Sequence, residues 1–237
     1  MSRSLYAGWD SKQGRRDYQQ DAVGFCEGPA GWLGVVADGV GSYEGSDRAS
    51  VLAVESAIAS TALALVDGGD LPLYAATAVE DTHRNIRREM DALGKPGATT
   101  LALVLVAGAR AVVAHVGDSR VYRLRAGRLE QLTEDHRASR HVLTRSLGSE
   151  RATADDCTPD VLETDVQPGD VWLLSTDGVH ESLTPEQLAA VLTDGADARV
   201  AAQALVESAL AAGSRDNCTA LVVRVPGEAP ETVRGAA

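Results

Sequence analysis

The sequence contains little cysteine, which limits the covalent and metal chemistry open to it. Its 237 residues include three cysteines, Cys26, Cys157 and Cys218. The number is odd and no pair has the C-x-x-C spacing, so neither a disulfide framework nor a zinc site is indicated. We expect a protein that works in a reducing compartment.

Long apolar runs are also absent. The most apolar segment, TTLALVLVAGARAVVAHVG, is interrupted by Gly108 and Arg110 and is too short to span a membrane. The first residues, MSRSLYAGWDSKQG, lack the apolar core of a secretory signal peptide. We therefore expect a cytoplasmic protein without a membrane partner.

Positive charge is scarce relative to negative charge. Lys and Arg number 22 against 34 Asp and Glu, which gives a net charge of -12. Nucleic acids and anionic membranes require clustered cations, so we expect neither as the main partner. The 44% hydrophobic and 24% charged residues are typical of a soluble globular protein. We expect one large domain over residues 1–226, followed by a mobile polar tail over residues 227–237.

The first half of the chain changes from strand patterns to helix patterns. Three short strands, separated by Gly and Pro, are expected at Leu5–Lys12, Ala22–Glu27 and Trp32–Asp38. An amphipathic helix, SDRASVLAVESAIASTALALVD, then begins with Ser46 or Asp47 as its N-cap. A second amphipathic helix closes at Gly94. We expect the two helices to pack together on one face of a sheet.

The second half repeats this order. Four apolar or alternating runs, LALVLVAG, RAVVAHVG, SRVYRLRAG and RLEQLT, are joined by tight turns, which predicts a β-meander. Two more strands precede a helix with Thr184 as N-cap, Pro185 at its first position and Gln187 completing a capping box. Another helix and a last strand follow. This α+β order predicts a β-sandwich of two antiparallel sheets flanked by helix pairs, in four αββα layers.

Aspartates stand at the ends of several predicted strands or in the turns that enter them: Asp21, Asp38, Asp118, Asp177 and Asp216. Such residues can meet at one rim of a sandwich, and a cluster of oxygen ligands selects Mg²⁺ or Mn²⁺ rather than zinc. Two ions that share a carboxylate would activate a water molecule for attack on phosphorus. An isolated Asp-Gly pair is usually an ordinary turn, so the interpretation depends on the whole set.

A glycine follows two of these aspartates, at Gly39 and Gly178. A residue without Cβ lets a backbone carbonyl approach an ion and permits an unusual φ angle. We therefore expect both glycines to serve the predicted metal site.

The order of the motifs resembles a known family. RRDYQQD, VVADGVG, GATTLALVLV, AHVGDSRVYRLRAG, LTEDH, LTRSLG, WLLSTDGVHESL and SRDNCTALVV occur in this order in the metal-dependent Ser/Thr protein phosphatases of type 2C, the PPM family. The resemblance extends from about Leu5 to Val225 and fits a compact bacterial member. It implies a single phosphatase catalytic domain that hydrolyses phosphoserine and phosphothreonine on proteins by a metal-activated water.

The resemblance also implies a set of metal-binding residues. Asp38 matches the carboxylate that bridges two Mn²⁺ or Mg²⁺ ions, and the carbonyl of Gly39 matches a ligand of one of them. Asp177 and Asp216 match ligands of the other ion, while Asp21 would hold a metal-bound water.

Three further positions carry implied roles. Arg16, rather than Arg15, has the spacing of the arginine that grips the substrate phosphate. Asp118 matches a position that helps to hold a third, weaker metal in bacterial relatives. We interpret His136 as a structural, hydrogen-bonded histidine, because nothing in the sequence places it beside the metals.

Several residues depart from the family pattern. Gln20 stands where many members carry Glu, Val40 replaces a histidine proposed as general acid in eukaryotic members, and Glu181 replaces an aspartate. The change at Glu181 affects the third metal site that the resemblance implies. Only RASRHV separates LTEDH from LTRSLG, where relatives insert a longer helical flap, so we expect broader or partner-dependent specificity.

Other functions fit less well. Cys218 and Arg224 obey the C-x5-R spacing of cysteine phosphatases, but TALVV between them predicts a strand rather than a phosphate-binding loop. A catalytically weak or inactive regulatory module with the same fold stays open as the alternative. The expected partners are phosphorylated proteins, in general targets of a cognate Ser/Thr kinase, and we expect a monomer.

Overall fold

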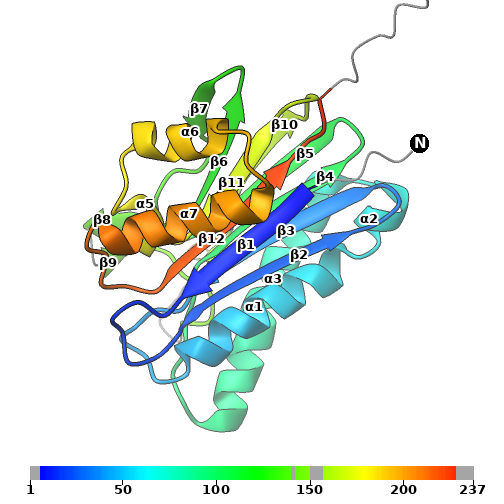
Figure 1. Cartoon of the computed structure of the whole chain (residues 1–237). Coiled ribbons are helices and arrows are strands. Elements are labelled where there is room, and N and C mark those ends of the chain that lie inside the picture. Colours follow the sequence, from blue (N-terminus) through cyan, green and yellow to red (C-terminus); the bar gives the residue numbers. More distant parts are fainter. Residues whose placement is uncertain (1–5, 140–141, 150–156, 228–237) are drawn as a thin grey trace, which may run out of the picture.

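The computed structural model describes residues 6–139, 142–149 and 157–227. Two antiparallel five-stranded sheets face each other and form a sandwich, with helices on both outer faces (Figure 1). The predicted fold class, an α+β sandwich in four αββα layers, is confirmed. Within the described ranges, no helix has both the length and the apolar character needed to cross a membrane.

Every strand pairing in the two sheets is antiparallel. The first sheet, in spatial order, consists of β1 (Tyr6–Lys12), β12 (Cys218–Arg224), β11 (Val171–Ser175), β6 (Arg120–Arg125) and β7 (Arg128–Gln131). The second sheet consists of β10 (Asp160–Asp165), β5 (Arg110–Val116), β4 (Leu101–Ala107), β3 (Gly31–Asp38) and β2 (Asp21–Glu27). A separate hairpin pairs β8 (Arg137–Ser139) with β9 (Val142–Leu143).

Helices cover the outer face of each sheet (Figure 1). The second sheet is covered by α1 (Ser46–Thr61), α2 (Ala64–Asp67) and α3 (Leu71–Leu93). The first sheet is covered by α6 (Pro185–Thr193) and α7 (Ala198–Ala211), and the short helix α5 (Asp177–His180) follows β11 directly.

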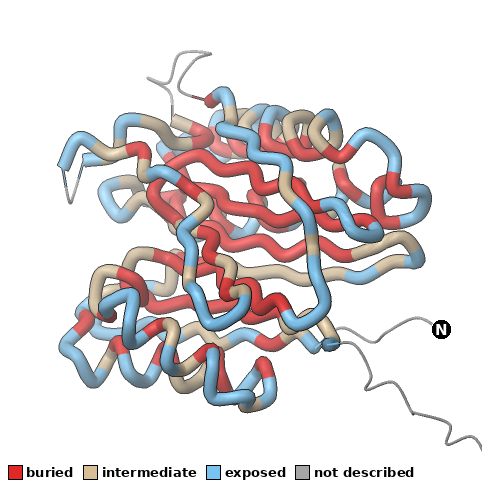
Figure 2. The backbone as a smooth tube through the Cα atoms, turned by 90° about the horizontal axis from the view of Figure 1, so that it is seen from above, coloured by how far each residue is buried: buried red, intermediate tan, exposed pale blue. Residues whose placement is uncertain are grey.

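The apolar core lies in three layers, one between the sheets and one beneath each set of helices. Figure 2 shows the buried backbone concentrated in the central strands and the exposed backbone on the periphery. Trp32 of β3 and Trp172 of β11 meet between the sheets, edge to face, with ring centroids 6.2 Å apart. Burying a large apolar side chain stabilises the fold by about 1.5–3 kcal/mol, so this layer holds the two sheets firmly together.

The helix ends follow the sequence signals in two cases out of three. Thr184 and Gln187 form the predicted capping box of α6, and Gly94 closes α3 in the left-handed conformation with φ 63°. The prediction of Ser46 or Asp47 as the N-cap of α1 is wrong, because Gly45 is the cap and makes no side-chain bond. The Ser46 hydroxyl instead donates to the carbonyl of Val40, 2.7 Å away. This side chain thus fixes the loop that follows β3.

The predicted four-stranded meander is also wrong. The hairpins β4–β5 and β6–β7 form as expected, but β5 belongs to the second sheet and β6 to the first. The chain crosses between the sheets at Gly117, whose φ of 104° is readily adopted only by glycine. A Cβ at this position would lie 2.5 Å from a methyl group of Thr100, so the crossing leaves no room for a side chain. Asp118 therefore lies at the edge of the sandwich.

The boundaries of the predicted domain and tail stay predictions. Residues 228–237, which make up nearly all of the predicted tail, lie outside the described residues.

Candidate functional site

The strand ends bring the predicted aspartates to one rim of the sandwich. Asp21 begins β2 and Asp38 ends β3, and the two are direct cross-strand neighbours. Asp177 follows β11 and Asp216 precedes β12 in the other sheet, while Asp118 lies at the crossing between the sheets. The antiparallel order places all these ends at the same edge, so the rim is built from both sheets.

A pocket of about 530 Å³ opens at this rim. Its lining includes four of the predicted aspartates, together with a single arginine among the described residues: Asp38, Asp118, Asp177, Asp216 and Arg16. Asp21 lies deeper, 7% exposed, behind Asp38. The described lining of the pocket is therefore strongly acidic, and Arg16 contributes the positive charge in it.

The backbone around Asp38 is fixed by two threonines. The Asp38 amide donates to the Thr100 hydroxyl at 2.9 Å, and the Thr100 amide donates to the Asp38 carbonyl at 2.8 Å. The Thr99 hydroxyl donates to the same carbonyl at 2.9 Å. Both hydroxyls are engaged in bonds that hold the end of β3, so we assign Thr99 and Thr100 a structural role.

The glycines after Asp38 and Asp177 are required for a reason different from the predicted one. Neither Gly39 nor Gly178 has a positive φ angle, so the expectation of an unusual φ is wrong. A Cβ on Gly39 would lie 2.5 Å from the carbonyl oxygen of Ser46, and one on Gly178 would lie 2.0 Å from that of Asn217. Backbone packs against backbone at both positions, which keeps the aspartates close together.

Arg16 lies on a loop that is held by Asn217. The side chain of Asn217 accepts from the amide of Gln20 at 2.8 Å and donates to the carbonyls of Gln13 and Tyr18 at 2.8 and 3.0 Å. Sequence reasoning missed this anchoring role, although Asn217 directly follows Asp216. Arg16 itself forms an ion pair with Asp216 at 2.6 Å, and its side chain is 52% exposed.

Burial, and after it the negative charge of neighbouring carboxylates, raises the pKa values of three aspartates at the rim. Burial, followed by the negative charges of Asp21 and Asp177, raises the pKa of Asp38 well above its ordinary value. Burial raises the pKa of Asp21 to about 7, partly offset by hydrogen bonds from Thr219 and Thr176. Burial and the charge of Asp216 raise the pKa of Asp177 to about 7. A cluster of this kind gains stability when positive charge enters it.

The donor set fits a hard divalent cation. The rim offers carboxylate and carbonyl oxygens, which Mg²⁺ and Mn²⁺ prefer. Two buried oxygens, Oδ1 of Asp21 and Oδ1 of Asp177, accept no hydrogen bond from the described residues. An unpaired buried carboxylate oxygen is costly unless a water or an ion satisfies it. The residues present therefore fit the divalent ions that the sequence predicts.

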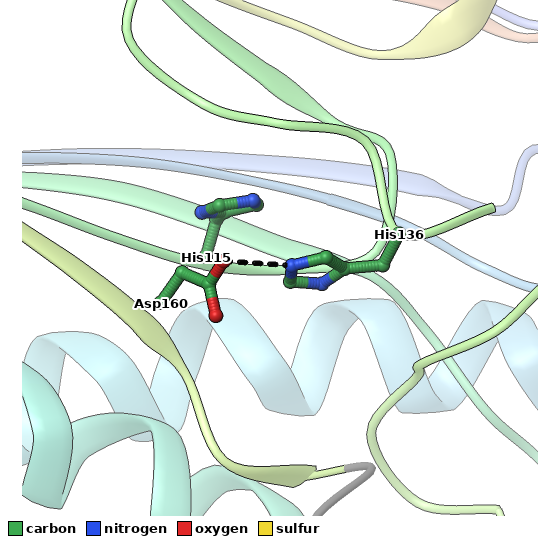
Figure 3. Close-up of side chains that lie close together, drawn as sticks. All are labelled: His115, His136 and Asp160. Atoms are coloured by element: carbon green, nitrogen blue, oxygen red, sulfur yellow. Dashed lines mark hydrogen bonds and ion pairs between the residues drawn. The ribbon is translucent and has the colours of Figure 1, made fainter.

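A second cluster of possible metal ligands consists of His115, His136 and Asp160 (Figure 3). None of the three lines the pocket at the rim. The two imidazole rings stack 4.5 Å apart at 19°, so their lone pairs lie in nearly parallel planes. Arg145 lies 2.8 Å from Nε2 of His136 and 2.7 Å from Oδ1 of Asp160, where an ion would have to bind. We assign this cluster to the structure of the protein rather than to metal binding.

His136 has a clear structural function. Its amide donates to the carbonyl of Gly117 at 3.0 Å, and its Nδ1 accepts from the amide of Gly117 at 3.1 Å. The ring thus fixes the turn immediately before Asp118. This geometry agrees with the interpretation of His136 as a structural histidine.

The residues of the cysteine-phosphatase pattern do not form a loop. Cys218 and Arg224 are the two ends of β12, and Cys218 is buried. Burial raises the pKa of the Cys218 thiol to about 11, which disfavours the thiolate that such chemistry needs. The structure therefore gives no support to a cysteine nucleophile at this position.

The fold and rim together define a class: an αββα sandwich with a candidate all-oxygen cation site at one edge. The sequence profile of the family described as Protein phosphatase 2C matches residues 10–212. The chain belongs to the protein phosphatase 2C family.

Individual relatives agree with this assignment. The serine/threonine protein phosphatase PstP of Mycobacterium tuberculosis is 31% identical in an alignment of 210 residues that covers 80% of this chain and 40% of that protein. The chain thus spans less than half of the length of PstP. The serine/threonine phosphatase stp of Listeria monocytogenes is 27% identical over 246 residues, covering 92% of this chain and 95% of that protein.

A solved structure extends the comparison to three dimensions. The crystal structure of the catalytic domain of PstP, in complex with two manganese ions, matches with a TM-score of 0.78 at 28% identity. The match covers 94% of this chain and 98% of that structure. The whole sandwich, rather than a part of it, is therefore shared.

Proposed function

We propose that this chain is a metal-dependent protein phosphatase that hydrolyses phosphoserine and phosphothreonine in proteins. The observation that carries the proposal is the rim of aspartates with raised pKa values beside one exposed arginine. Membership of the protein phosphatase 2C family supports it. The names of the relatives, which are Ser/Thr phosphatases, point to the same activity.

We assign the ion ligands from the residues of the rim. Asp38, the carbonyl of Gly39, Asp177 and Asp216 would hold two Mn²⁺ or Mg²⁺ ions, as the family resemblance implies. Asp21 would hold a water molecule from behind Asp38, through the oxygen that lacks a protein donor. When bound, the ions lower the pKa of a water molecule between them and neutralise charge on the phosphate.

Arg16 would bind the substrate phosphate. Its planar guanidinium presents paired N–H groups that match two phosphate oxygens. The half-exposed side chain lines the pocket and is accessible to a phosphorylated side chain from solvent. Asn217 would act indirectly, because it fixes the loop on which Arg16 lies.

Val40 cannot protonate the leaving group, which is the side-chain oxygen of the serine or threonine. Val40 lines the pocket and has no proton to donate. Gln20 also lines the pocket, and its amide is neutral, so it adds no negative charge to the rim. We infer that Gln20 lowers the ion affinity. With Val40 in place of a general acid, protonation of the serine or threonine oxygen would come from a metal-bound water or from another acid.

Phosphate release from a phosphothreonine peptide tests the proposal. We expect turnover with Mn²⁺, none with EDTA, and a loss of at least about a hundredfold in kcat/KM for Asp177→Asn with Mn²⁺. Asp194→Asn, at an exposed aspartate outside the pocket lining, is the matched control and should keep full activity. A folded protein that stays inert at saturating Mn²⁺ would instead support the alternative, a regulatory module without catalysis.

We propose three further properties of the chain. They are a single catalytic domain over residues 1–226, a monomeric state and a cytoplasmic location. The substrates would be phosphoproteins, in general targets of a cognate Ser/Thr kinase.

A further inference from the structure

Asp118 and Glu181 lie on either side of one guanidinium group. Nη1 of Arg137 forms an ion pair with Oε1 of Glu181 and lies 3.9 Å from Oδ2 of Asp118. Both carboxyl groups are largely buried, with side-chain exposures of 9% for Asp118 and 14% for Glu181. These are the positions at which the resemblance implied a third metal ion. A cation supplied by the chain itself is present there instead.

Arg137 is held in place from behind. Its Nη2 lies 2.9 Å from Oδ2 of Asp135, and Asp135 receives two further bonds of 2.7 Å from Arg120. Nη1 of Arg120 in turn donates to the hydroxyl of Tyr122 at 3.0 Å. Arg120 thus holds Asp135 by a bidentate pair, and Asp135 in turn holds Arg137. A guanidinium that contacts fixed carboxylates on both of its Nη groups is difficult to displace.

We propose that Arg137 is a permanent cation between Asp118 and Glu181, and that it keeps a third divalent ion out of this position. The inference rests on the proposed metal-dependent function but concerns the number of ions rather than turnover. The site would then work with two ions, those held at Asp38 and its neighbours. The guanidinium of Arg137 would supply the positive charge that the resemblance assigns to a third ion and, unlike an ion, it could not dissociate into solvent.

Electrostatic repulsion by Arg137, rather than a lack of access from solvent, explains why an ion would be kept out. Arg120 and Arg137 face three carboxyl groups, those of Asp118, Asp135 and Glu181, so the cluster already contains nearly matched charge. A divalent ion would need the same oxygens that the Nη1 group faces and would meet the repulsion of a fixed positive charge. Access is not the barrier, because an open pocket of about 580 Å³ is lined by Arg120, Arg137 and Glu181.

Counting bound Mn²⁺ ions tests the proposal independently of activity. Equilibrium dialysis at matched free Mn²⁺ should give one more ion per chain for Arg137→Gln than for the unchanged protein. The double variant Arg137→Gln with Asp118→Asn should lose that extra ion. Arg137→Lys, which keeps a positive charge, and Arg128→Gln, at an exposed arginine of β7, should bind as many ions as the unchanged protein.

A second measurement uses the chain without any change to Arg137. Asp118→Asn alone should leave the number of bound Mn²⁺ ions unchanged, because no ion is held there. A loss of one ion in Asp118→Asn would overturn the proposal, and so would an unchanged count in folded Arg137→Gln. Failure of the proposed phosphatase function would be seen separately, as absence of phosphate release while the ion counts still differ as expected.

Discussion

Replacing Asp21 by Asn should stabilise the protein in the absence of metal ions while weakening ion binding. Asp21 is 7% exposed, lies beside Asp38, and has one carboxylate oxygen without a hydrogen-bond donor among the described residues. Burial raises its pKa from 3.8 to about 7. The folded state therefore binds a proton at Asp21 more tightly than the unfolded state does.

The sign and size of the effect follow from this difference. A carboxyl group whose pKa is higher in the folded state destabilises the fold as pH rises between the two pKa values. Each tenfold change in proton affinity corresponds to about 1.4 kcal/mol, so the penalty is about 4 kcal/mol at pH 8 and about 1.6 kcal/mol at pH 5. Asn carries no charge and avoids this penalty. The gain from Asp21→Asn should thus be larger at pH 8 than at pH 5, by about 2–3 kcal/mol.

Denaturation by urea in EDTA measures this gain at the two pH values. In thermal melts the difference between the two pH values should appear as about 5–10 °C in Tm, since 1 kcal/mol shifts the Tm of a chain of this size by about 2–4 °C. Asp194→Asn, at an exposed position, should show no comparable dependence on pH. An Asp21→Asn protein that is destabilised equally at pH 5 and pH 8 would refute the reasoning.

Three further perturbations probe the same rim. Gly39→Ala should lower the free energy of unfolding by about 2 kcal/mol or more, because the added Cβ would lie 2.5 Å from the carbonyl oxygen of Ser46. Gly41→Ala is the control and should change the free energy of unfolding far less, because its Cβ would have its nearest neighbour at 3.4 Å. Equal effects of the two substitutions in urea denaturation would contradict this. Arg16→Ala should raise KM for a phosphopeptide by at least about tenfold, and an unchanged KM would exclude Arg16 as the phosphate ligand. Binding of Mn²⁺ should release protons and weaken below about pH 7, because Asp21 and Asp177 hold protons there. Calorimetry in buffers of different ionisation heat measures this release, and heats independent of the buffer would argue against it.

The aspartate rim could be predicted because its signal is local. Each aspartate stands next to an apolar run in the sequence, and the antiparallel order of the strands then brings the ends together. The capping box at Thr184 is local in the same sense. Such features depend on neighbours a few residues away, which the sequence displays directly.

The parts that were missed depend on contacts between distant segments. The crossing at Gly117 could not be seen, because the Gly turns within the hairpins and the turn between the sheets look alike in sequence. Ser46 resembles an N-cap, yet its hydroxyl bonds to Val40 once α1 packs beside the rim. The position of Arg137 between Asp118 and Glu181 joins three segments, and no spacing in the sequence connects them.

The origin of the rim in both sheets has a mechanical consequence. Asp21 and Asp38 belong to one sheet, Asp177 and Asp216 to the other, and the Thr176 hydroxyl already bridges them by donating to Asp21 at 2.8 Å. An ion shared by these side chains would link the two sheets to each other. Separation of the two sheets would break the bonds between the ion and its ligands. A bound ion should therefore slow the unfolding of the sandwich, and the lifetime of the folded chain should depend on the concentration of free metal ion.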